Sequence, residues 1–135
     1  MKNQDIVLLV IHAAPNFPEY FVHPLQKLLQ EKGVFIEYID TDSHSDDFYL
    51  DFILQSLFNK KQIFVYIQVE PEQKKLPNNC TKILSQLHKI KEKSNILCSC
   101  PNIMLQAYTR NFSVCSDFDL QKQAEYIISC IKTQC

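Results

Sequence analysis

The sequence predicts an α/β domain in which a doubly wound parallel sheet of about five strands lies between two layers of helices. Short, continuous apolar runs rich in β-branched residues recur along the chain, which is typical of strands covered on both faces. Segments with helical periodicity separate these runs, and the joints are short. Such alternation implies right-handed crossovers and a three-layer arrangement. The 135 residues fit one domain, expected to span residues 1–135.

The first strand is predicted at residues 6–11 (IVLLVI). A helix follows, with Asn16 as its N-cap and with Gly33, the chain's single glycine, just beyond its last turn. Pro24 falls inside this segment, so it must either kink the helix or mark a second start. Residues 34–39 (VFIEYI) form the second predicted strand.

Ser45 or Asp46 caps the second predicted helix, whose apolar residues recur at helical spacing from Leu50 to Leu57. Residues 63–69 (IFVYIQV) form the third strand. The polar stretch 70–79, with two prolines, is expected to be a loop.

The second half of the chain repeats the pattern. Asn79 leads into a helix with one apolar stripe, residues 96–100 form a strand, and residues 102–111 form a short helix after Pro101. A short fifth strand is predicted at residues 112–115. The sequence Ser116-Asp117-Phe118-Asp119 fits a capping box that opens the last helix. Five such units predict a flavodoxin-like sheet, in which ligands bind beyond the carboxyl ends of the strands near the switch in strand order.

His12 is the first candidate at that rim. A histidine at the end of a central strand is well placed for proton transfer or metal ligation. It could equally satisfy a loop carbonyl group. Glu70 and Glu72 follow the third strand and could face His12 across the switch point. His12 and Glu70 are then the candidate catalytic residues. His12, Glu70 and Glu72 are the candidate metal ligands. Solvated surface glutamates are the alternative interpretation.

Two other rim loops carry weaker signals. Asp40 and Asp42 could hold a hard cation such as magnesium, but an acidic helix start explains them as well. Cys98 and Cys100 could ligate a soft metal, although thiolate sites generally need three or four ligands. Buried, inert thiols are the favoured interpretation of these two cysteines.

Composition excludes several function classes. The net charge of −1 gives no electrostatic argument for nucleic acid or an anionic membrane. A single glycine cannot build a dinucleotide-binding fingerprint or a Walker loop. The apolar run at residues 6–11 is shorter than a secretory or membrane segment requires. We therefore expect a cytoplasmic protein with reduced cysteines.

The stretch LLVIHAAP at residues 8–15 resembles the first strand and loop of small class II chelatases of the sirohydrochlorin cobaltochelatase type. In that family the motif is Gly-His-Gly-Ser, and the histidine serves metal insertion into a tetrapyrrole. The resemblance implies that His12 acts on divalent cobalt, nickel or iron. Ile11 and Ala13 replace the flanking glycines, and Glu70, Glu72 or Gln73 stand where the second histidine is expected.

The order of the later elements is also similar to that of these chelatases. The loop after the first strand has a rival resemblance to flavodoxin-like quinone reductases, which have a His-Pro loop at this position. Here Ala13 and Ala14 intervene, and the serine and glycine positions that hold flavin phosphate are not evident. The first hypothesis is therefore a domain without catalysis that binds a small molecule or a protein partner at the rim. The alternatives are a chelatase-like enzyme and a flavin-binding reductase. A homodimer is compatible with the chelatase resemblance.

Overall fold

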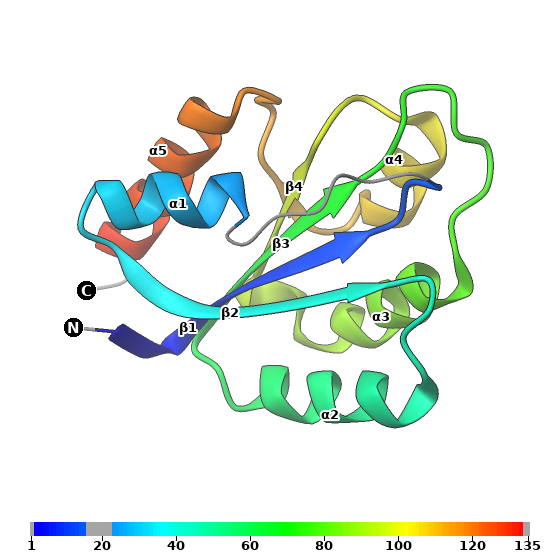
Figure 1. Cartoon of the computed structure of the whole chain (residues 1–135), viewed down its shortest axis with the longest axis horizontal. Coiled ribbons are helices and arrows are strands. Elements are labelled where there is room, and N and C mark those ends of the chain that lie inside the picture. Colours follow the sequence, from blue (N-terminus) through cyan, green and yellow to red (C-terminus); the bar gives the residue numbers. More distant parts are fainter. Residues whose placement is uncertain (1, 16–22, 134–135) are drawn as a thin grey trace.

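The computed structural model describes residues 2–15 and 23–133. Its elements are β1 (Lys2–His12), α1 (Pro24–Glu31), β2 (Phe35–Asp42), α2 (Asp47–Phe58), β3 (Gln62–Gln68), α3 (Asn78–Leu87), a 3-10 helix η1 (His88–Lys93), β4 (Ser94–Cys98), α4 (Ile103–Thr109), β5 (Ser113–Val114) and α5 (Leu120–Thr133). The five strands pair in parallel in the order β2-β1-β3-β4-β5. This topology confirms the predicted flavodoxin-like fold (Figure 1).

The two faces of the sheet carry separate cores because successive strand residues point to opposite sides. On one face, Val7, Leu9 and Ile11 of β1 pack with α2 and α3, and Leu105 of α4 joins them. On the other face, Leu8 and Val10 pack against α1 and α5. Figure 1 shows α1 and α5 side by side, away from α2 and α3.

Helix α1 begins at Pro24, so the proline marks a helix start and not a kink. His23 is the N-cap, and its side chain accepts a hydrogen bond from the backbone N–H of Leu25. The predicted start at Asn16 lies outside the described residues. Gly33 follows the C-cap residue Lys32 and has a φ of +81°, a conformation that glycine adopts without strain.

The other helix starts differ in how they are capped. Asp46 caps α2, which selects it over Ser45, the other N-cap residue that the sequence allowed. Helix α5 begins later than the predicted capping box implies, because Asp119, and not Ser116, accepts the hydrogen bond from the backbone N–H of Lys122. Pro77 occupies the N-cap of α3 and cannot cap through its side chain. The short helix η1 was not predicted, since neither glycine nor proline marks it.

The direction of the crossovers sets the position of a binding site. The chain leaves β1 toward the face covered by α1, but it leaves the neighbouring strand β3 toward the face covered by α3. The carboxyl ends of β1 and β3 therefore form the topological switch point, where open α/β sheets have a crevice for ligands.

Candidate ligand site at the switch point

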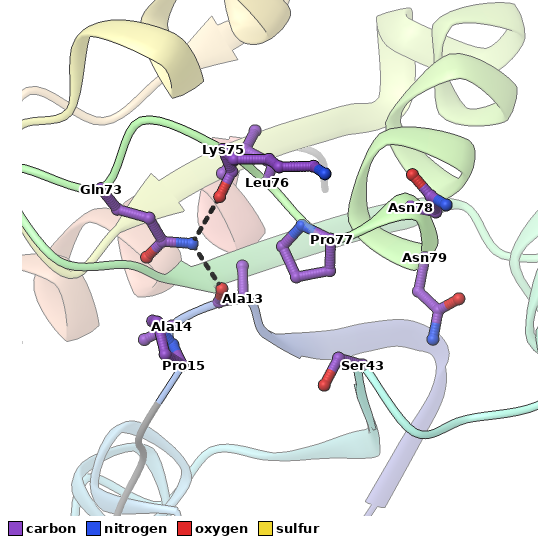
Figure 2. A pocket seen from close by; sticks show the side chains of 10 residues that line it. All are labelled: Ala13, Ala14, Pro15, Ser43, Gln73, Lys75, Leu76, Pro77, Asn78 and Asn79. Carbon is purple, nitrogen blue, oxygen red and sulfur yellow. Dashed lines mark hydrogen bonds between the residues drawn. The ribbon is translucent and has the colours of Figure 1, made fainter.

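A hollow of about 500 Å³ lies at this switch point. It is lined by residues 13–15 after β1, Ser43 after β2, Gln73 and residues 75–77 of the loop between β3 and α3, and Asn78 and Asn79 at the start of α3 (Figure 2). We call it the switch-point hollow. Its volume falls within the range of small-molecule sites, roughly 300–1,000 Å³. Three of the strand-to-helix loops at the rim contribute to it.

Gln73 joins two of these loops. Its Nε2 donates to the carbonyl oxygen of Ala13 at 2.6 Å and to that of Lys75 at 3.0 Å, as Figure 2 shows. Its Oε1 accepts from the backbone N–H of Glu70 at 3.2 Å. Because one side chain binds both sides of the hollow, the loops after β1 and β3 are held at a fixed separation.

Asn79 fixes the third loop. Its Nδ2 donates to the carbonyl oxygens of Asp42 at 2.7 Å and Ser45 at 3.0 Å, which attaches the loop after β2 to the first turn of α3. The hydroxyl of Thr41 in turn donates to that of Ser45 at 2.8 Å. The walls of the switch-point hollow are therefore built without a ligand, and such a pre-formed site loses little conformational entropy on binding.

The lining of the switch-point hollow favours negative charge. Among the described residues that line it, Lys75 is the one charged side chain, and no aspartate or glutamate is present. The first turn of α3 opens at Asn78 and Asn79 and has no side-chain cap. First-turn N–H groups lack intrahelical acceptors and carry the positive end of the helix dipole.

His12 ends β1 but points to the opposite face of the sheet from Ile11 and Ala13, toward α1. It is buried, and its ring centroid lies 6.5 Å from that of His23. Burial lowers the pKa of His12, while the negative charges of Asp40 and Asp42 and a hydrogen bond with the Gln68 side chain oppose this shift. The neutral imidazole is therefore favoured near pH 7.

His23 is the partner of His12 that the sequence did not single out. Its Nδ1 accepts the Leu25 N–H at 3.1 Å, so the proton of the neutral ring resides on Nε2. The rings of His23 and Tyr66 pack edge to face, with centroids 5.0 Å apart and an interplanar angle of 67°. Burial, assisted by the charge of His12, lowers the pKa of His23 to about 4. Pro24 was the signal in the sequence for the position of His23, because a proline at the first position of a helix makes the preceding residue the N-cap.

Glu70 and Glu72 are exposed in the loop after β3. The carboxylates whose charge acts on His12 are those of Asp40 and Asp42, at the end of the neighbouring edge strand β2. Within residues 2–15 and 23–133, no group of three His, Cys, Asp or Glu side chains is arranged to hold a metal ion. The assignment of His12, Glu70 and Glu72 as metal ligands stays a prediction.

Of the cysteines that the structure describes, Cys80, Cys98 and Cys115 are buried in the two cores. Burial raises the pKa of both Cys80 and Cys98 to about 12, which keeps these thiols protonated. The half-buried Cys100 donates from Sγ to the carbonyl oxygen of Val69 at 3.1 Å. Cys98, Cys100 and Cys115 line a second, more apolar cavity of about 330 Å³ between α4 and residues 114–118, which precede α5.

No protein-family model, curated protein or solved structure matches this chain. In the part of the chain that the structure describes, no helix combines the length and the apolar character needed to cross a bilayer.

Proposed function

We propose that this domain binds a small anionic molecule in the switch-point hollow and catalyses no reaction there. The observation that carries the proposal is a pre-formed hollow at the β1–β3 switch point whose described lining holds one cation, Lys75, and no carboxylate. Ligands of open α/β sheets bind at this place for geometrical reasons, whatever their chemistry.

The chemistry of the lining defines the ligand class. The lining includes the ammonium group of Lys75, the hydroxyl of Ser43 and the amide of Asn78, and each of these groups is a hydrogen-bond donor. The N-terminus of α3 adds a favourable potential for phosphate or carboxylate. Ala14, Leu76 and Pro77 supply apolar contacts for the remainder of the molecule. A small phosphate monoester or a small free carboxylate fits this combination.

Binding without catalysis is favoured because the described lining contains no histidine, cysteine or acidic side chain. General acid–base and nucleophilic catalysis depend on such groups. His12 and His23 lie together on the other face of the sheet, buried beside Tyr66.

A chelatase-like reaction is the second candidate, and the neighbouring imidazoles of His12 and His23 are the observation in its favour. Divalent cobalt or nickel would then be substrate. Native mass spectrometry after cobalt addition tests this candidate: retained metal that is lost in both His12→Ala and His23→Ala supports it. If the wild-type protein retains no cobalt or nickel, the chelatase proposal is rejected. Flavin absorbance of the purified protein would instead indicate the reductase alternative.

Thermal unfolding in inorganic phosphate tests the anion proposal. We expect phosphate to raise Tm relative to chloride at equal ionic strength, because a ligand that binds only the folded state stabilises it. Lys75→Ala should abolish this rise. Lys74→Ala is the matched control, since Lys74 is exposed in the same loop and does not line the hollow. An equal phosphate effect in both variants, or none in the wild type, would reject the proposal.

A further inference from the structure

Helix α2 exposes aromatic side chains along its outer face. Phe48 is 86% exposed and Phe52 is 58% exposed, although Leu50, Ile53, Leu54 and Leu57 on the opposite side are buried against the sheet. The helix is therefore apolar around most of its circumference. A helix of this kind is usually covered on both sides, and exposed aromatic patches mark interaction surfaces.

Tyr49 and Phe52, two aromatic residues of α2, are restrained by contacts within the domain before any partner arrives. The rings of Tyr49 and Phe52 stack with centroids 6.3 Å apart and an interplanar angle of 17°. The hydroxyl of Tyr49 donates to the carbonyl oxygen of Asp40 at 2.8 Å, which connects the helix to the edge strand β2. We call Phe48, Tyr49 and Phe52 the aromatic face. Rigid aromatic anchors of this kind dominate the affinity of protein interfaces.

Acidic side chains surround the aromatic face. Asp40, Asp46 and Asp51 are exposed beside it, and α2 contains no lysine or arginine between Asp47 and Phe58. Asp47, at the side toward α3, is paired with Lys82 at 3.4 Å. The surface therefore combines an apolar centre with a negative rim, and charge complementarity selects a partner with a positive one.

We propose that the aromatic face of α2 is the docking surface for a basic amphipathic helix of a different protein. The apolar stripe of the partner helix would cover Phe48 and Phe52, and the lysine or arginine side chains of that helix would face Asp46 and Asp51. A second copy of this chain placed symmetrically on the same face is disfavoured, because a two-fold interface would bring the same acidic rim onto itself. The acidic rim likewise disfavours an anionic membrane.

A synthetic amphipathic helical peptide of leucine and lysine is the probe, and a peptide with glutamate at every lysine position is the control. We expect the basic peptide to bind with at least about tenfold higher affinity, and chemical-shift changes in labelled protein to map to α2. The double variant Phe48→Ser with Phe52→Ser should lose most of this affinity. Asp51→Lys should weaken binding while the aromatic face remains.

The matched control variant is Ile103→Ser with Tyr108→Ser on α4, where Ile103 is 84% exposed and Tyr108 is also exposed. It should bind the basic peptide as the wild type does. Circular dichroism checks that each variant is folded, and the four exposed positions make unfolding an unexpected outcome. The proposal would be overturned if the acidic peptide bound with equal affinity, or if the α4 variant lost as much affinity for the basic peptide as the α2 variant. It would also be overturned if the protein formed a dimer that the α2 variant does not form, or if it bound phosphatidylserine vesicles in a way that requires Phe48.

Discussion

The side-chain amide of Gln73 donates a 2.6 Å hydrogen bond to the carbonyl oxygen of Ala13, sixty positions earlier in the chain. Ala13 is buried, so this bond also satisfies a carbonyl group that water cannot easily reach. The hydrogen bond joins the loops after β1 and β3, the neighbouring strands whose crossover helices lie on opposite faces of the sheet. It therefore determines the width of the switch-point hollow on which the proposed function depends.

Gln73→Leu should destabilise the protein by about 2 kcal/mol, because it removes the bond and leaves the Ala13 carbonyl group unsatisfied. The free energy of unfolding from urea titration measures this change. Gln121→Leu, at an exposed position of α5, is the control and should change stability by no more than about 0.5 kcal/mol. Equal effects of the two substitutions would show that Gln73 does not fix the loops.

Asn79→Ala should release the loop after β2 from α3, since it removes both bonds from Nδ2 to Asp42 and Ser45. We expect a loss of about 1–2 kcal/mol in unfolding free energy and faster hydrogen exchange of amides around Ser45. Asn78→Ala, at the exposed neighbouring position, serves as the control. Unchanged exchange in Asn79→Ala would contradict the role given to this side chain.

His23 makes stability depend on pH. Its pKa falls from 6.5 in the unfolded chain to about 4 in the folded one. Below pH 6.5 the unfolded state therefore binds more protons, so the free energy of unfolding should decrease as pH falls from 6.5 to 4 and should level off below that. The shift corresponds to a loss of about 3 kcal/mol, and the lowered pKa of His12 acts in the same direction.

His23→Asn isolates this effect, because asparagine keeps a capping acceptor for the Leu25 N–H and does not titrate. Urea unfolding between pH 4 and pH 6.5 should show a smaller slope in the variant than in the wild type. His44→Asn, at an exposed position, should keep the full slope. If His23→Asn also keeps it, the protonation of His23 is not linked to folding.

The thiols should differ in reactivity. Burial raises the pKa of Cys80 and Cys98 to about 12, so neither should react with iodoacetamide at pH 8 in the folded protein. Among the cysteines that the structure describes, the half-buried Cys100 and Cys130 should be alkylated first. Peptide mass spectrometry after short labelling reports the order, and rapid labelling of Cys98 would contradict its burial.

The fold could be predicted from local sequence patterns because its central strands are buried on both faces and are therefore continuously apolar. The apolar runs of β1 and β3 have no solvent-exposed face and therefore read as central strands of a covered sheet. The ends of elements were less accurate. Strand β4 begins at Ser94 because backbone pairing with Ile63 is independent of side-chain polarity, and α5 begins where Asp119 supplies the cap.

The candidate site was only partly predictable. The switch point follows from topology, and the sequence correctly placed His12 at the rim. Which face His12 points to depends on the register of β1, and its partner His23 lies on another element. The contacts of Gln73 and Asn79 join loops that are distant in sequence, and no local pattern signals them. The proposed roles of Glu70 and Glu72 stay predictions.

A nuclear magnetic resonance titration of the labelled protein with inorganic phosphate tests the central claim most directly. We predict saturable shifts of the backbone amides of Ser43, Asn78 and Asn79, which Lys75→Ala removes and Lys74→Ala preserves. Amides around His12 and His23, on the other face of the sheet, should move little. Shifts centred on His12 and His23, or no saturable shift at Asn78 and Asn79, would contradict a ligand site in the switch-point hollow.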